Sequence, residues 1–116
     1  MIETVDYYIY EDSFIFKPYF NGFINDYINI ISNYKKLIFS NYNEPKLCVK
    51  ANNNYIANYH DKHKSSYFNK PLSDSLNNLT QLQQLTFGDC FNHPLSDSLN
   101  NQIQLQKLTF IILINH

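Results

Sequence analysis

Two histidines in the middle of the chain have the type and spacing of metal ligands. His60 and His63 stand three residues apart, so a helix would turn both imidazoles toward one side, where they could bind zinc. A zinc site needs about four ligands, and the neighbouring residues supply neither a cysteine pair nor a His-Glu-x-x-His motif. The segment is also rich in lysine, which favours a solvated loop. We therefore predict no metal site and no cofactor.

The candidate nucleophiles are one cysteine and two serine triplets. Cys90 would need a histidine base held against it, and the nearby His93 lies instead in an Asn-His-Pro turn. The Ser-Asp-Ser triplets at residues 73–75 and 96–98 occupy the same position of a repeat, which is typical of turns that cap backbone N–H groups. The chain's two glycines stand alone, so a glycine-rich phosphate loop cannot form. The sequence predicts a protein without a catalytic site.

The charge pattern argues against nucleic acid as a partner. The formal net charge is −1, and a typical nucleic-acid or anionic-membrane binder carries a positive surplus. Residues 35–70 hold seven lysines against Glu44 and Asp61. The chain has no arginine, the residue that makes bidentate contacts with phosphate and guanine. We expect a solvated lysine-rich surface and no nucleic-acid partner.

Cysteine usage and hydropathy indicate the compartment. Cys48 and Cys90 are isolated in the sequence, and acidic residues stand where a secretory signal would be basic. The longest apolar run, residues 110–114, is far shorter than the ~20 residues that cross a bilayer. We expect an intracellular, cytoplasmic protein with free thiols that is neither secreted nor membrane-spanning.

A repeat dominates the C-terminal half and must position any functional surface. Residues 68–87 recur as residues 91–110, with an offset of 23 and sixteen of twenty positions identical. From the end of the first copy into the three residues that follow it, Leu82, Leu85, Phe87 and Cys90 have the LxxLxLxxC spacing of a leucine-rich-repeat strand. The second copy repeats this spacing with Leu105, Leu108 and Phe110. On the back of the first coil the chain returns through Leu72, Leu76 and Leu79. The pattern predicts a short solenoid of two clear 23-residue coils.

The two copies resemble a known repeat family. Phe68, Asn69 and Pro71 in the first copy, and Phe91, Asn92 and Pro94 in the second, reproduce the Phe-Asn-x-Pro motif that is tied to each strand. This motif resembles the FNIP repeat, a relative of leucine-rich repeats found in social amoebae and giant DNA viruses. The resemblance implies a leucine-rich-repeat-like solenoid.

The residues before the repeat predict four further features. Residues 1–36 contain an alternating pattern expected to form a hairpin over 4–17 and an amphipathic stripe expected to form a helix over 22–35. This helix would cap the open end of the solenoid. Residues 37–66 contain a weaker, degraded copy of the repeat, with Tyr42 in place of the motif phenylalanine, and then a polar loop over 50–66.

Together these elements predict an α+β fold with a short leucine-rich-repeat-like solenoid, an N-terminal hairpin and a helix. The two repeats over residues 67–116 look like a truncated array, because a solenoid needs about three stacked units and a polar cap. The apolar C-terminal strand would then allow oligomerisation or aggregation.

The predicted function is protein–protein interaction with an unknown partner. In a leucine-rich solenoid the outward strand positions line a concave recognition face, which here would comprise Gln83, Gln84, Thr86, Asp89, Gln106, Lys107 and Thr109. One alternative is a decaying member of an expanded repeat family without specific activity. A third is an F-box adaptor for a ubiquitin ligase, which requires residues 14–45 to fold as a helical bundle and which the lack of leucine before Leu37 disfavours.

Overall fold

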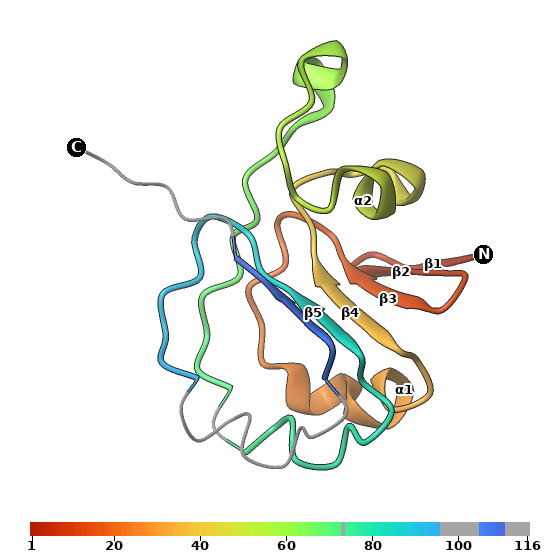
Figure 1. The fold of residues 1–116 in the computed structure, drawn as a ribbon, viewed down its shortest axis with the longest axis vertical. Coiled ribbons are helices and arrows are strands. Elements are labelled where there is room, and N and C mark those ends of the chain that lie inside the picture. The colour runs from red at the N-terminus through yellow and green to blue at the C-terminus, as the bar shows by residue number, and fades with distance from the viewer. Residues whose placement is uncertain (73, 96–104, 111–116) are drawn as a thin grey trace.

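A six-stranded sheet forms the frame of the protein in a computed structural model that describes residues 1–72, 74–95 and 105–110 (Figure 1). The strands lie in the sheet in chain order, and short helices accompany them, so the mixed α+β class expected from the sequence is confirmed. The strands are β1 (Ile2–Glu3), β2 (Tyr7–Tyr10), β3 (Ser13–Phe16), β4 (Lys36–Phe39), β5 (Gln84–Thr86) and β6 (Lys107–Thr109).

The expected N-terminal hairpin is present. Strands β2 and β3 pair antiparallel, with Tyr7 opposite Phe16 and Tyr10 opposite Ser13. Glu11 turns the chain in the left-handed conformation at φ 55°, which lets a short turn join the two strands. The short strand β1 adds to the outer edge of β2. The hairpin therefore covers one edge of the strands that follow.

Strands β3 to β6 pair in parallel, each joined to the next by a crossover. Leu85 pairs with Leu108, its equivalent in the second copy, which is the register that the repeat alignment predicts. Phe14 pairs with Leu37, and these two residues are as far apart along the chain as Leu85 and Leu108 are. Leu37 and Leu85 are further apart in sequence, so the middle crossover is longer. The sequence separation of the repeat thus also occurs between β3 and β4, although the amino-acid types there do not match the two clear copies.

The crossover from β3 to β4 contains two short helices, η1 (Ile24–Tyr27) and α1 (Ile28–Ile31). A single helix over 22–35 was expected, so that prediction is too long at both ends. Asparagine and serine recur through this segment and compete for backbone hydrogen bonds, which shortens helices. The helices belong to the connection from β3 to β4, and the N-terminal hairpin, not a helix, covers the edge of β3 (Figure 1).

The long crossover from β4 to β5 begins with two more helices, α2 (Pro45–Ala51) and η2 (Ala57–Lys62). Pro45 opens α2 at a position where its missing N–H costs nothing. Asn52 and Asn53 end the helix in the left-handed conformation, at φ 50° and 64°. The polar loop expected over 50–66 is therefore partly helical. We refer to residues 42–66 as the insertion; Figure 1 shows it rising from one end of the sheet.

The sheet separates two apolar clusters, because successive strand residues point to opposite faces. The larger cluster contains the phenylalanines and leucines of β3, β4 and β5 together with the back leucines Leu72, Leu76, Leu79 and Leu82, all of them buried. The smaller cluster lies on the other face and joins Tyr8, Ile15 and Ile38 to Leu47 and Cys48 of α2. The insertion thus supplies the cover for the second face of the sheet.

Candidate functional site

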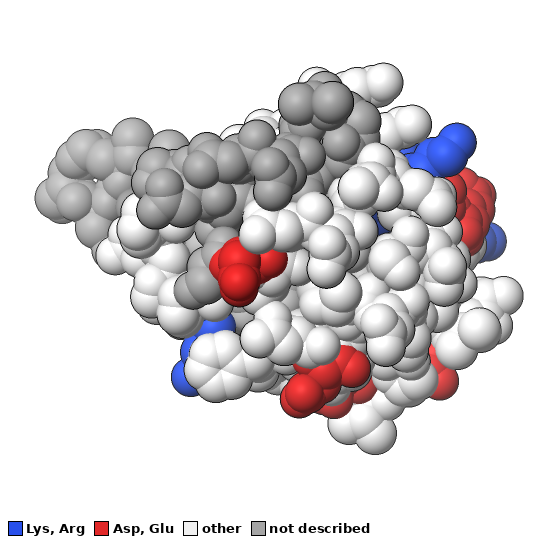
Figure 2. All heavy atoms as spheres, turned by 90° about the horizontal axis from the view of Figure 1, so that it is seen from below, with Lys and Arg blue, Asp and Glu red and all other residues white. Residues whose placement is uncertain are grey.

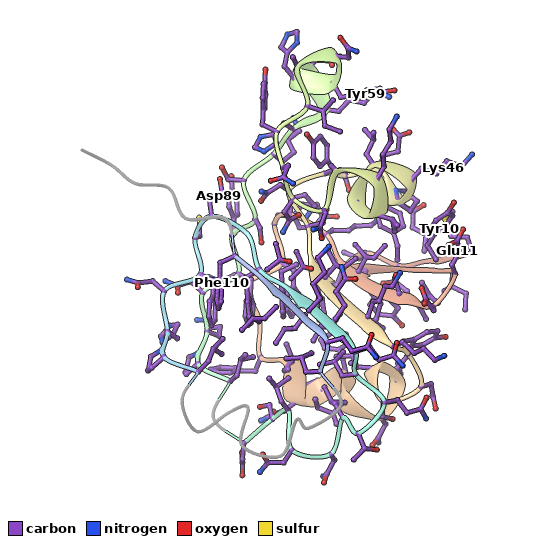
Figure 3. The ribbon with its side chains drawn as sticks, viewed as in Figure 1. Tyr10, Glu11, Lys46, Tyr59, Asp89 and Phe110 are labelled. Atoms are coloured by element: carbon purple, nitrogen blue, oxygen red, sulfur yellow. The ribbon has the colours of Figure 1, made fainter. Side chains whose placement is uncertain are left out.

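A row of stacked phenylalanine rings runs across the parallel strands. Phe16, Phe39, Phe87 and Phe110 end or directly follow successive strands, with ring centroids 5.2, 5.4 and 5.3 Å apart and planes within 15° of parallel. Each ring contacts the ring of the next strand, which buries apolar surface and adds aromatic stacking energy. Figure 3 shows Phe110 at one end of this row.

A second row of rings runs beside the first. Phe20, Phe68 and Phe91 stack with centroids 6.0 and 5.8 Å apart. Each also has its centroid 4.0 Å from that of the first-row ring of the strand it follows in space. The first and third of these pairs have the same short spacing in sequence, four positions. In the middle pair, the insertion separates Phe39 from Phe68.

An asparagine ladder accompanies the second row. The backbone N–H of Asn69 donates to Oδ1 of Asn21 at 2.9 Å, and the N–H of Asn92 donates to Oδ1 of Asn69 at 2.8 Å. Phe20 and Asn21 are therefore a third Phe-Asn pair, which the sequence analysis missed because Gly22-Phe23 follows it instead of x-Pro. Its signal was present in the sequence: Phe20 stands four positions after a strand phenylalanine, as Phe91 does.

Asn41 closes the base of the insertion. Its Oδ1 accepts the N–H of Ser66 at 2.9 Å, and its carbonyl accepts the N–H of Lys64 at 2.6 Å. Tyr42, which the sequence analysis aligned with the motif phenylalanine, belongs to the smaller cluster on the opposite face of the sheet. That alignment is wrong at this position, because the chain returns through the insertion before Phe68 fills the stack.

Asn53 joins the insertion to the ends of two strands. Its side-chain NH₂ donates to the carbonyls of Phe39 at 2.7 Å and Phe87 at 3.0 Å, and its Oδ1 accepts the N–H of Asn41 at 2.9 Å. The residue is buried. One amide thus serves three backbone groups at the ends of β4 and β5.

The seven predicted recognition residues differ widely in exposure. Gln106 and Lys107 are exposed, and Gln83 is half-buried on the neighbouring segment, where its carbonyl accepts the N–H of Gln106 at 2.8 Å. Thr86 is fully buried, and its hydroxyl and the Gln84 amide both point at Oδ1 of an insertion residue, Asn52. The insertion therefore covers the β5 end of the predicted face and leaves the β6 end accessible.

Of the remaining two predicted recognition residues, one follows β5 and the other is the last residue of β6. Asp89 and Thr109 are half-buried. Within the part of the chain that the structure describes, Oδ1 of Asp89 is buried without a hydrogen-bond partner. Asp89 is consequently a poor contact residue in this state.

The predicted structural positions of the first strand follow the expected burial except at Cys90, whereas two of the second strand's positions are exposed. Leu82, Leu85 and Phe87 are fully buried. Cys90 was expected to close the coil by pointing inward, and it is exposed; Phe91 packs against the core in its place. Leu105 is partly buried, whereas Leu108 and Phe110 at the sheet's edge are 39% and 41% exposed. The triplet at residues 96–98 lies outside the described residues, as does position 73 of the first triplet.

The residues singled out for chemistry are engaged in local contacts. His63 makes edge contacts with the rings of Tyr42 and Tyr55, at centroid distances of 5.2 and 5.5 Å. Nδ1 of His60 lies 3.3 Å from the carbonyl oxygen of Ala57. Among residues 1–72, 74–95 and 105–110, no group of three or more histidine, cysteine or acidic side chains could hold a metal ion. Nor does any described helix have the length and apolar character to cross a bilayer.

The buried thiol of Cys48 is held in its neutral form. Desolvation raises the pKa of Cys48 to about 11, although a hydrogen bond with the Ser40 hydroxyl at 2.9 Å acts in the opposite direction. The thiol hydrogen also faces the carbonyl of Tyr42 at 3.1 Å. A nucleophilic role would need a thiolate, so this cysteine acts as a packing residue.

Three ion pairs join charged side chains within the described residues. Lys17 is buried beside Glu3 at 2.9 Å and lies over the ring of Tyr8. Two further pairs lie on the surface: Lys36 with Asp12 at 3.5 Å, and Lys62 with Glu44 at 2.9 Å. Figure 2 shows that the described residues seen from below are largely uncharged, with separate acidic and basic spots.

Two adjoining hollows lie where the insertion meets the first part of the chain. The first, of about 120 Å³, is lined by Pro18, Tyr19, Asn43, Lys64, Ser65 and Tyr67. The second, of about 270 Å³, is lined by Asn43, Glu44, Asp61, Lys62 and Lys64. Asn43 and Lys64 border both. The sequence analysis did not find this site, because its walls come from distant parts of the sequence.

Comparisons with known proteins identify no matching family model, no matching curated protein and no matching solved structure.

Proposed function

We propose that this chain is a short FNIP-type repeat solenoid that acts as a non-catalytic protein-interaction module. The observation that carries the proposal is the recurrence of one unit in space: strand phenylalanine, Phe-Asn pair, and back crossover. Phe-Asn pairs at residues 20–21, 68–69 and 91–92 stack ring on ring, and each asparagine after the first donates its N–H to the asparagine before it.

The proposed array has three coils, which is about the number that a solenoid needs to bury a continuous core. They begin at β3, β4 and β5, and β6 opens a fourth. This count is supported by the equal separation in sequence of β3 from β4 and of β5 from β6. The second coil carries the insertion between Asn41 and Tyr67, and its ends are closed by the hydrogen bond from Ser66 to Asn41. This count adds a coil that begins at β3 to the two clear copies and the degraded copy expected from the sequence.

The proposed interaction surface is the polar strip at the β6 end of the strand face. It consists of Gln83, Gln106 and Lys107, with Thr109 at its margin; the first and last are half-buried and the other two are exposed. Amide and ammonium groups there can form hydrogen bonds with a partner. A standard interface buries ~800 Å² on each side, so the surrounding surface must contribute as well.

Affinity capture with the immobilised full chain tests this function. A double variant, Gln83→Arg with Gln106→Arg, introduces two bulky charges on the strip and should abolish capture of any protein bound by the native chain. The control Gln81→Arg carries the same substitution at an exposed position on the back of the coil and should capture the same protein. Equal capture by all three chains would contradict the proposed surface.

The F-box alternative is not retained. It requires a helical bundle over residues 14–45, and those residues contain β3, η1, α1 and β4. Two strands of this segment pair with each other in the sheet, so the surface on which an F-box binds its adaptor is not formed there.

A further inference from the structure

We propose that the first hollow, at the base of the insertion, binds an extended proline-containing peptide that carries an acidic residue beside the proline. This adds a partner chemistry to a surface distinct from the strand strip described above. It rests on the walls of the hollow, its size and the charge at its rim, and does not depend on the function proposed for the strip.

The walls of the hollow are exposed tyrosine rings held by the fold. Tyr19 and Tyr67 are 50% and 57% exposed, and both line the hollow together with Pro18. The N–H of Tyr67 donates to the carbonyl of Pro18 at 2.7 Å, and the hydroxyl of Tyr19 donates to the carbonyl of Val5 at 2.8 Å. The Tyr19 ring and the backbone of Tyr67 are therefore already in position for a ligand, which lowers the entropic cost of binding.

The size of the hollow selects one type of peptide. A volume of about 120 Å³ accommodates a single small side chain such as a proline ring, whereas an amphipathic helix needs several anchors in a long groove. No residue of a β-strand lines the hollow, so a peptide cannot add there as a further strand. Proline-rich segments are extended in advance and dock on aromatic surfaces through their rings.

The charge at the rim selects the residue beside the proline. Lys64 borders both hollows, and within the described residues it forms no ion pair. The other lysine of the second hollow, Lys62, is already paired with Glu44 at 2.9 Å. A carboxylate next to the bound proline would pair with the ammonium of Lys64. Asp61, in the second hollow, would repel a second acidic residue placed further along the peptide.

Fluorescence anisotropy with a labelled peptide, Gly-Pro-Pro-Asp-Pro-Pro-Gly, tests this site on the full chain. We expect saturable binding that weakens about tenfold or more when alanine replaces the prolines, and similarly for the protein variant Tyr67→Ser. The matched control is Tyr55→Ser, because Tyr55 is 61% exposed and lies outside the hollow; this variant should bind as the native chain does. A thermal melt of each variant verifies that it is folded.

A charge exchange tests the role of Lys64 separately. The variant Lys64→Glu should bind the aspartate peptide about tenfold more weakly and should prefer a peptide in which lysine replaces aspartate. Equal binding of the proline and alanine peptides, unchanged binding by Tyr67→Ser, or no exchange of preference by Lys64→Glu would each overturn the proposal. The double variant Gln83→Arg with Gln106→Arg should bind the peptide normally, which separates this site from the strand strip.

Discussion

Among the described residues, asparagine side chains take part in most of the side-chain hydrogen bonds that join distant parts of the chain. An amide offers both donors and acceptors, so one residue can satisfy several backbone groups. Asn41 and Asn53 do so inside the protein, and Asn21 and Asn69 accept backbone N–H groups on its surface. Asparagine also tolerates the left-handed conformation that Asn53 adopts. At this scale the fold depends on uncharged polar groups in specific positions.

The variant Asn53→Ala should be strongly destabilised. It removes an amide that serves the carbonyls of Phe39 and Phe87 and the N–H of Asn41. Leaving such groups buried without partners costs about 1–3 kcal/mol each, so we expect a loss of about 2–5 kcal/mol in urea unfolding. Asn54→Ala, at the next and exposed position, is the control and should change stability little. Similar losses in both variants would contradict the role of Asn53.

The two cysteines should differ sharply in reactivity. Cys90 is exposed and Cys48 is buried with its pKa raised to about 11. In a thiol titration with Ellman's reagent near neutral pH, we expect one thiol to react quickly and the second only after denaturant is added. Cys90→Ser should remove the fast phase. A fast phase that persists in this variant would show that Cys48 is accessible.

Stability should fall at alkaline pH for the same reason. Burial raises the pKa of Cys48 from its ordinary value of 9.0 to about 11, so the folded state prefers the protonated thiol. This contribution is complete below pH 9 and is lost as pH rises from about 9 to about 11, because the unfolded chain releases the proton first. The variant Cys48→Ala should show a weaker decline in unfolding free energy across this range. An identical decline would assign the effect to other groups.

Each parallel strand repeats the same inward pattern of apolar residues, and this repetition holds the elements together. A ring at the end of one strand lies on the ring of the next, and Gly88 allows a close approach at the turn after β5. A Cβ atom at Gly88 would lie 2.1 Å from the side chain of Ser66 and 2.7 Å from Oδ1 of Asn41. The segment that starts at β5 therefore combines large stacked side chains with a position that only glycine fits.

Equivalent leucines in neighbouring strands should differ in their contribution to stability. Leu85 is fully buried between β4 and β6, whereas its partner Leu108 is 39% exposed at the edge. Leu85→Ala should cost about 2–5 kcal/mol, as expected for a buried leucine, and Leu108→Ala should cost clearly less. Chemical denaturation of both variants measures the difference. A larger loss at Leu108 would contradict the exposed edge.

For the molecule as a whole, the insertion between β4 and Phe68 completes the second core. The insertion leaves and returns at adjacent points, because Asn41 holds Ser66. It also covers Ile38 and Tyr8 with residues of α2. The same segment forms the hollows and covers Thr86 on the strand face. The insertion thus contributes to the stability of the protein and also determines which parts of its surface are accessible.

Deleting residues 42–66, so that Asn41 joins Tyr67, should preserve the stacked repeat at lower stability. The deletion restores between Phe39 and Phe68 the short spacing that the other two ring pairs have. It exposes Ile38 and Tyr8, so we expect a cooperative circular-dichroism melt at a reduced temperature and binding of a hydrophobic dye. A chain that loses its cooperative transition altogether would contradict the idea that the insertion is separate from the coils.

The sequence alone determined the hairpin, the strand positions of the two clear copies and the burial of the leucines in the first copy. These features depend on residues close together in the chain, whose alternation fixes which side faces the core. The register of β5 with β6 followed from the identity of the two copies. The resemblance of the Phe-Asn-x-Pro segments to a repeat family was also visible in the residues alone.

Only the tertiary structure decided which segments complete the stack and which surfaces stay open. Phe68 follows Phe39 in space, although the whole insertion separates them in sequence, because hydrogen bonds to Asn41 close the insertion between them. The burial of Thr86 and the hollow between Tyr19 and Tyr67 depend on the same closure. Local periodicity carries no information about such contacts, since their energy comes from groups that become neighbours only when the chain folds.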